Sequence, residues 1–128
     1  PTWAHLSLNS LPFGERMFGW ELAWSRNSRY FSIMEWRSTE YGKGPDIHLL
    51  LVDLERGEEC VVERAEGGFI DPVKIAVRRA GVIFVLYEKR FYGRRGHSDR
   101  GYVKLDEDQV WRAVSPHLPT YVSQSNHE

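Results

Sequence analysis

The sequence is poor in the features that mark several large classes of protein. It has a single cysteine, Cys60, among 128 residues, so no disulfide can form within the chain. No apolar stretch has the length of a membrane-spanning helix, and the first residues lack the charged-then-apolar layout of a secretory signal. The net charge of −1 provides no strong overall field. We therefore expect a soluble, cytoplasmic protein with no membrane partner, in which Cys60 is a buried, inert thiol.

Motifs for metal binding and catalysis are also missing. The five histidines are not spaced as metal ligands, and no nucleophile elbow or phosphate-binding loop is present. Glu35 and Glu88 lie at nearly matched positions of two predicted strands and offer, in principle, an acid/base pair. The favoured interpretation is that they face water or pair with Arg37 and Arg90. We predict no metal, no cofactor and no enzymatic activity, and keep an enzyme with an unrecognised site as the third alternative.

Alternating apolar residues and turn signals predict a chain made of short strands. The predicted strands cover residues 21–25, 30–37, 46–54, 58–63, 73–77, 82–87, 101–105 and 110–114. The clearest feature is the hairpin of residues 46–63, whose apolar run 49–52 ends at a tight turn. We expect a type I turn at Glu55 and Arg56, followed by Gly57 in the left-handed conformation as a G1 bulge. The abundance of aromatic residues, with five Trp, six Tyr and six Phe, is typical of a β-rich core.

The strands fall into two similar halves. Residues 21–65 and 73–114 align with an offset of 52 or 53 positions, which indicates an internal repeat of two four-stranded antiparallel meanders. We expect one all-β domain over 1–128, in which the meanders pack as a sandwich or half-open barrel. One continuous twisted sheet is the alternative. Residues 1–20 are predicted to be an irregular arm over the core, and 115–128 a tail. Residues 107–114 fit a strand or a short helix, and the repeat favours the strand.

Two segments carry a family resemblance. Residues 22–31 resemble the blade motif of TolB-type β-propellers, in which a Trp-Ser-Pro-Asp-Gly turn precedes an apolar strand, and residues 49–58 resemble the hairpin that follows it. The match covers about one third of the chain and has a weaker second copy. Arg26, Asn27 and Ser28 replace the Pro, Asp and Gly of the motif. The resemblance implies blade-like sheets, but two blades cannot close into a propeller ring.

Charge is distributed unevenly along the chain. Residues 53–71 contain seven acids and two bases, whereas residues 74–100 contain eight bases and two acids. The basic part is densest at 89–100, where arginines alternate with aromatic residues. The repeat brings this segment and the loop at 38–46 to equivalent positions. The candidate partner-binding residues are Tyr41, Lys43, Arg90, Tyr92, Arg94, Arg95 and Arg100.

Arginine and tyrosine anchors suit two kinds of partner. We favour a non-catalytic protein-binding module, similar in type to small bacterial immunity proteins, which neutralise a toxin by binding it directly. The alternative is a nucleic-acid-binding module that uses loop 89–100 to contact phosphates and bases. The absence of an overall basic excess counts against the nucleic-acid alternative.

Overall fold

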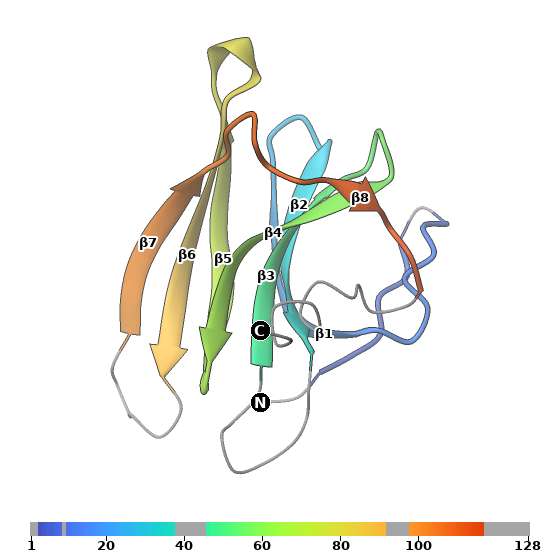
Figure 1. Cartoon of the computed structure of the whole chain (residues 1–128), viewed down its shortest axis with the longest axis vertical. Coiled ribbons are helices and arrows are strands. Elements are labelled where there is room, and N and C mark those ends of the chain that lie inside the picture. Colours follow the sequence, from blue (N-terminus) through green and yellow to red (C-terminus); the bar gives the residue numbers. More distant parts are fainter. Residues whose placement is uncertain (1–2, 9, 38–45, 92–97, 117–128) are drawn as a thin grey trace, which may run out of the picture.

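The computed structural model describes residues 3–8, 10–37, 46–91 and 98–116, which form two antiparallel β-sheets (Figure 1). The strands are β1 (Met17–Trp24), β2 (Tyr30–Trp36), β3 (Asp46–Asp53), β4 (Glu58–Glu66), β5 (Gly68–Val77), β6 (Ile83–Phe91), β7 (Ser98–Lys104) and β8 (Arg112–Ala113). Their order is β1-β2-β3-β4-β8 in the first sheet and β5-β6-β7 in the second. Within the described residues the one helical segment is the 3-10 turn η1 (Arg79–Gly81), and no helix is long and apolar enough to cross a membrane. The predicted all-β class is confirmed.

The first sheet is centred on β2 and β3. These strands pair along their full length, from Tyr30 opposite Asp53 to Trp36 opposite Ile47. Nearly every residue of both strands is buried, because apolar side chains occupy odd and even positions and both faces of the sheet are covered. This is the central place that was predicted for residues 30–37.

The turn between β3 and β4 differs slightly from the prediction. Asp53 pairs with Glu58, so the loop contains four residues rather than three. Gly57 has a φ of 65°, the left-handed conformation expected for it, and its amide donates a 2.8 Å hydrogen bond to the Asp53 carbonyl. The Asp53 carboxylate accepts hydrogen bonds from the backbone amides of Glu55 and Arg56, at 3.0 and 3.3 Å. These bonds stabilise the longer loop.

The second sheet has three strands, not the four that were predicted. The short strand β8 exists, so the strand interpretation of this segment is confirmed over the helix, but it pairs with β4 of the first sheet. After β7 the chain leaves the second sheet and crosses to the far edge of the first (Figure 1). Val114, which follows β8, is buried in the core of the first sheet and donates its amide to the Gly57 carbonyl. Burial of Val114 explains why this strand leaves its own meander.

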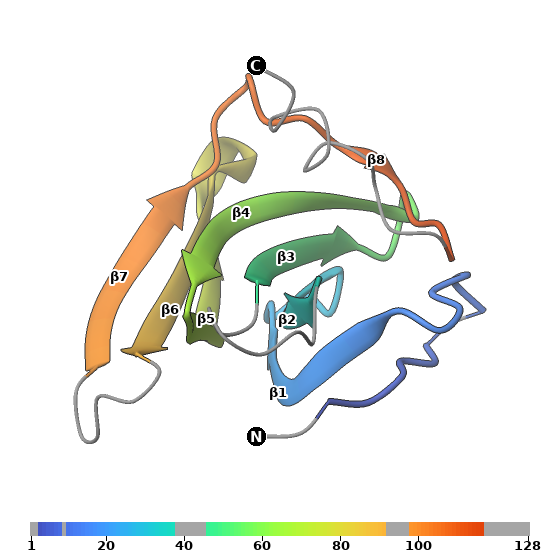
Figure 2. The ribbon, with the colours of Figure 1, turned by 60° about the horizontal axis from the view of Figure 1, so that its bottom comes forward.

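One core fills the space between the two sheets. Figure 2 shows β5, β6 and β7 to one side of the first sheet. The cluster combines Met34, Trp36, Ile47, Leu49, Leu51 and Cys60 of the first sheet with Phe69, Ile70, Ile75, Ile83 and Val85 of the second. The sheets therefore pack as a sandwich and do not close into a barrel.

A second core lies on the opposite face of the first sheet. It contains Phe13, Phe18, Phe31, Ile33, Leu50, Val52 and Val114. The N-terminal arm and the segment after β8 cover this face, as the arm was expected to do. They meet at Gly14, which has a φ of 61° and leaves no room for a side chain, because a Cβ there would lie 2.6 Å from Pro116 Cβ. The arm ends earlier than predicted, since β1 begins at Met17.

Candidate binding surfaces

Most of the predicted binding residues fall outside the part of the chain that the structure describes. Those residues are Tyr41, Lys43, Tyr92, Arg94 and Arg95. The strand ends that flank them, at the end of β2, the start of β3, the end of β6 and the start of β7, lie at the same end of the molecule (Figure 1). Arg90 and Arg100 are described, on β6 and β7.

The described cations of the predicted basic segment are bound to carboxylates. The pairs are Lys89 with Glu63 at 3.7 Å, Arg90 with Asp71 in two hydrogen bonds, and Arg100 with Glu88 at 3.7 Å. The hydrogen bond with Asp71 raises the pKa of Arg90. Glu63, Asp71 and Glu88 thus neutralise the three described cations of this segment.

A different group of cations surrounds a groove at the C-terminal end of β5. We call this groove the basic groove. It has a volume of about 360 Å³ and is lined by Arg26 and Asn27 of the β1–β2 turn and by residues 74–78. Arg26, Lys74 and Arg78 are exposed, and none of them has a carboxylate partner among the described residues. Sequence reasoning missed this group because Arg26 is far from the other two in the chain. The fold, rather than a motif, brings the three together.

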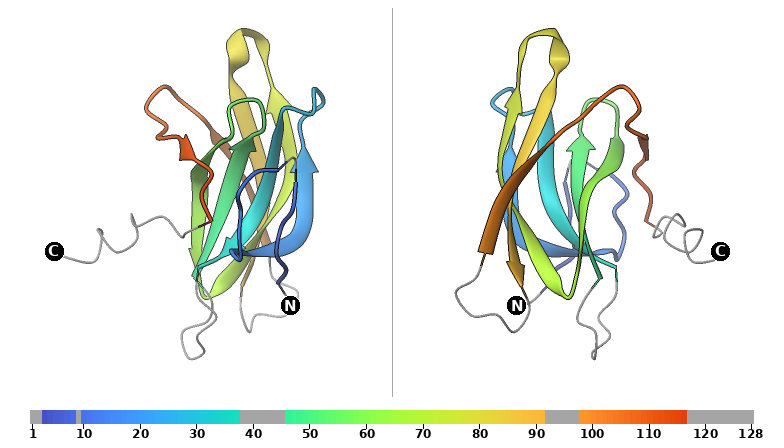
Figure 3. Two further views of the ribbon diagram at one scale, coloured as in Figure 1. Left: turned by 90° about the vertical axis from the view of Figure 1, so that its right-hand side faces the viewer. Right: turned by 60° about the vertical axis from the view of Figure 1, so that its left-hand side comes forward.

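Exposed apolar residues lie along the second half of β1, the edge strand of the first sheet, whose first half is bridged at Phe18 by Ala4 of the N-terminal arm. Trp20, Leu22 and Trp24 are 68%, 40% and 43% exposed. Leu22 and Trp24 lie two positions apart in the regularly paired part of the strand, and Trp20 lies in the irregularity of pairing between Phe18 and Leu22. Figure 3 shows β1 at the outside of the sandwich. Neighbouring large apolar side chains that are exposed to solvent are typical of contact surfaces. We call these three residues the β1 stripe.

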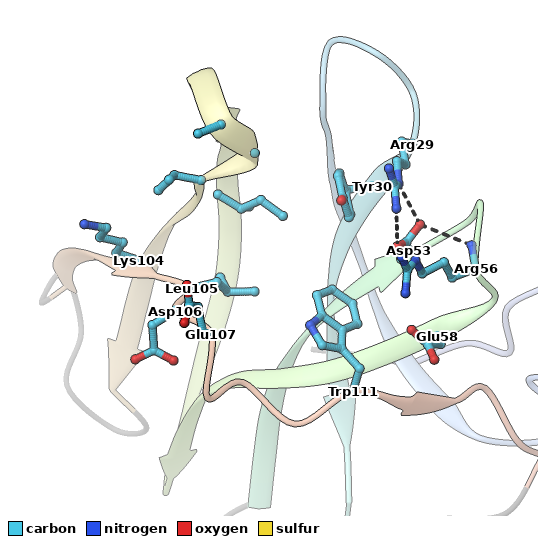
Figure 4. Close-up of a pocket in the computed structure, with 14 residues that line it drawn as sticks. Arg29, Tyr30, Asp53, Arg56, Glu58, Lys104, Leu105, Asp106, Glu107 and Trp111 are labelled. Carbon is cyan, nitrogen blue, oxygen red and sulfur yellow. Dashed lines mark hydrogen bonds and ion pairs between the residues drawn. The ribbon is translucent and has the colours of Figure 1, made fainter.

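A cleft of about 550 Å³ opens between the two sheets at the end opposite the predicted loops (Figure 4). Tyr30 and Trp111 provide aromatic walls. Two of its charged residues are bound to each other: the Arg29 guanidinium donates two hydrogen bonds of 3.0 Å to the Asp53 carboxylate. Burial opposes ionisation of Asp53, but the bonds from Arg29 and from backbone amides outweigh it, so the pKa of Asp53 is lowered. The pair holds two hairpin turns together, and we assign it a structural role.

A buried ionic cluster lies beneath the N-terminal arm. The Arg16 guanidinium donates two hydrogen bonds to Glu35, at 2.7 and 3.0 Å, and two to Glu59, both 2.9 Å, and a further 3.0 Å bond to the Ser115 carbonyl. Burial opposes its charge, but these carboxylates outweigh it and raise the pKa of Arg16. Burial raises the pKa of Glu59 despite the bonds from Arg16.

This cluster overturns the interpretation of Glu35 as a residue that faces water or pairs with Arg37. The Glu35 side chain is fully buried and bound to Arg16. Glu88 lies on the other sheet, where it accepts a hydrogen bond from Ser98 and pairs with Arg100 rather than Arg90. The two glutamates do not form an acid/base pair.

Two further reactive side chains are buried and inert. Burial raises the pKa of the Cys60 thiol to about 12, which leaves it protonated, as the sequence indicated. His48 is buried on β3, with Nδ1 3.4 Å from Arg37 Nη1. Burial, Arg37 and Arg64 lower the pKa of His48 from 6.5 to about 3, so the ring is neutral. Across the described ranges, no three His, Cys, Asp or Glu side chains gather as a possible metal site.

The described surface therefore offers two places for a partner, the β1 stripe and the basic groove. They are neighbours along the chain, because β1 ends at Trp24 and the following turn contributes Arg26 to the groove. The buried charged side chains Arg16, Glu35 and Glu59 form ion pairs with one another. Comparison with protein-family models, curated proteins and solved structures gives no match for this chain.

Proposed function

We propose that this chain is a non-catalytic protein-binding domain that contacts its partner through the β1 stripe. The observation that carries the proposal is the exposure of three large apolar residues, Trp20, Leu22 and Trp24, within five positions of one edge strand. Tryptophan buries a large area when a partner covers it and is among the residues that contribute most to protein interfaces. An edge strand also presents backbone groups that a partner can meet.

The charges favour a protein over a nucleic acid as partner. In the basic segment that suggested nucleic acid, Lys89, Arg90 and Arg100 are each paired with an acid. Paired cations release few counterions and attract phosphate weakly. The β1 stripe itself is apolar and has no cation among its three members.

The specific activity that we propose is that of an immunity protein, which neutralises a bacterial toxin in the cytoplasm by direct binding. A role without catalysis is supported by the engagement of Arg16, Glu35 and Glu59 with one another and by the burial of the Cys60 thiol. Such a protein needs a rigid contact surface, and β1 provides one because it pairs with β2 and packs against both cores.

The proposal is tested by co-expression with each protein encoded beside its gene. We expect one of these proteins to be toxic alone, to be tolerated in the presence of this chain, and to co-purify with it. Replacement of Trp20 and Trp24 by Ser should weaken binding at least about tenfold, because interface tryptophans commonly contribute more than 1 kcal/mol each.

Tyr102→Ser is the matched control, since Tyr102 is an exposed aromatic residue of β7 on the other sheet, 65% accessible. Circular dichroism and thermal melting confirm that each variant is folded. Unchanged binding in the Trp20 and Trp24 variants would exclude the β1 stripe, and a lack of any binding or protection would exclude the immunity function.

A further inference from the structure

The basic groove gathers three exposed cations, none of which has a carboxylate partner among the described residues. Arg26 projects from the turn after β1, Lys74 from the middle of β5 and Arg78 from its end. These residues come from both sheets, so the sandwich itself creates the groove. Three like charges around a volume of about 360 Å³ repel one another in the absence of an anion.

The protein has not neutralised these charges internally. Several other described cations are paired with acids, such as Arg29 with Asp53 and Arg64 with Asp46. The groove has no such partner among residues 3–8, 10–37, 46–91 and 98–116, and the side-chain oxygen of Asn27 is already used by Ser25 and the amide of Arg29. Charge complementarity therefore requires that the occupant be anionic.

The walls of the groove show which kind of anion fits. Ile75, Ala76 and Val77 also line the groove, and of these Ile75 is buried in the core whereas Val77 is 39% exposed. A phosphate ion or a nucleic-acid backbone would leave this apolar surface uncovered. Three cations in a chain of net charge −1 also fall short of the basic excess typical of nucleic-acid binders. A peptide that has carboxylates beside an apolar side chain matches both the cations of the groove and the exposed Val77.

We propose that the basic groove binds a short, extended, acidic segment of a partner protein, in which carboxylates contact Arg26, Lys74 and Arg78 and an apolar side chain covers Val77. This inference rests on the proposed function, because it specifies the chemistry of a protein partner at a second surface. Arginine binds carboxylate with two parallel hydrogen bonds, which provides both affinity and orientation. The groove recognises the partner by charge, and the β1 stripe contributes apolar contact area.

The test uses fluorescence anisotropy with three labelled probes and the full chain. The first is a short synthetic peptide of Glu and Asp with a central Leu, the second has the same length with Gln and Asn in place of the acids, and the third is a single-stranded oligonucleotide of equal charge. We expect the acidic peptide to bind, more weakly at physiological than at low ionic strength, and the neutral peptide not to bind.

Charge reversal locates the site. Lys74→Glu with Arg78→Glu should lower the affinity for the acidic peptide at least about tenfold. The matched control is Arg56→Glu with Lys104→Glu, which makes the same change in net charge at the cleft between the sheets. A retained affinity in the control, with a loss in the groove variant, supports the proposal.

Three results would overturn it. These are no binding of the acidic peptide at low ionic strength, equal loss in the groove and control variants, and tighter binding of the oligonucleotide than of the peptide. The last result assigns the groove to nucleic acid.

Failure of this proposal is distinguishable from failure of the proposed function. If a protein partner binds through Trp20 and Trp24 but is indifferent to the groove variant, the function stands and the groove assignment fails. If the peptide binds the groove but no partner protein is found among the products of neighbouring genes, the groove assignment stands and the proposed function fails.

Discussion

Arg16 forms hydrogen bonds with three separate segments of the chain. Its guanidinium contacts β2 through Glu35, β4 through Glu59 and the segment after β8 through Ser115. All of the donors face oxygen atoms, which is the geometry that offsets the desolvation of a buried arginine. The side chain acts as a connector between the arm and the sheet rather than as a reactive group.

Removal of this connector should destabilise the protein strongly. Arg16→Met leaves two buried carboxylates without a counter-charge, and we expect a loss of about 3–5 kcal/mol in the free energy of unfolding, measured by urea denaturation at neutral pH. Addition of Glu35→Gln and Glu59→Gln to Arg16→Met removes the orphaned charges and should recover part of the loss. A change below about 0.5 kcal/mol in Arg16→Met would show that the cluster is not stabilising.

His48 predicts a specific dependence of stability on pH. Its pKa is about 3 in the folded protein, below the usual 6.5 of an unfolded chain, so the unfolded state takes up the proton first. The stability that it contributes is complete above pH 6.5 and is lost as the pH falls toward 3. Below about pH 6 the free energy of unfolding should fall by about 1.4 kcal/mol per pH unit.

Denaturation between about pH 6.5 and 5 isolates this contribution, because most carboxylates titrate at lower pH. His48→Gln keeps an acceptor for Arg37 but does not titrate, and we expect its stability to be nearly flat in this range. Parallel curves for the two proteins would assign the acid sensitivity to another group.

At the scale of the element, the turn between β3 and β4 depends on one glycine. Gly57 adopts a φ of 65°, where a β-carbon is crowded by the backbone, and its carbonyl also accepts the amide of Val114. We expect Gly57→Ala to cost about 1–2 kcal/mol in the free energy of unfolding, measured by urea denaturation. Glu55→Ala, at an exposed position of the same turn, is the control and should change stability by less than about 0.5 kcal/mol. Equal effects of the two substitutions would show that backbone strain is not the cause.

The strands that could be predicted are those whose pattern is unambiguous. β2 and β3 were located almost to the residue, because unbroken apolar runs end at turn residues. The start of β5 was missed by five positions, because Gly67, Gly68 and Pro72 resemble a break. In the structure, Pro72 is tolerated within the strand beside the irregularity in pairing that separates it from Lys74.

The partner of β8 was not predictable from periodicity. Alternation shows that a segment is a strand but does not show which edge it joins. Here the burial of Val114 and the 3.0 Å hydrogen bond from the side-chain Nε2 of Gln109 to the Val61 carbonyl direct the chain to β4. The internal repeat and the resemblance to TolB-type blades stay predictions. Because β8 pairs with β4, the two sheets contain five and three strands rather than four each.

At the scale of the whole molecule, the charge polarity of the sequence becomes pairing in space. Glu63 and Asp71 of the acidic stretch bind Lys89 and Arg90 of the basic stretch. The described cations of the most basic segment are therefore paired, while Tyr92, Arg94 and Arg95 lie outside the described residues and stay predicted contacts. The basic groove combines residues from distant parts of the chain, and no pattern along the sequence identifies such a site.

The two cores share the first sheet, which predicts a single unfolding unit. The second sheet cannot keep its structure alone, because Ile70, Ile75 and Val85 would lose the cover of the first sheet. We expect tryptophan fluorescence and far-ultraviolet circular dichroism to give one coincident urea transition. Two separate midpoints would show that the sheets unfold independently.

The bond between Arg16 and Ser115 spans 99 positions of the chain, and its consequence concerns synthesis. A nascent chain emerges with its N-terminus first, and long-range contacts form late. While residues 112–115 are still within the ribosome, β4 has no neighbour on its outer edge and the core around Phe31 and Leu50 lacks Val114. The first sheet is therefore open to aggregation until residues 112–115 have emerged, so a segment made after β4 to β7 protects a sheet whose other strands are already available.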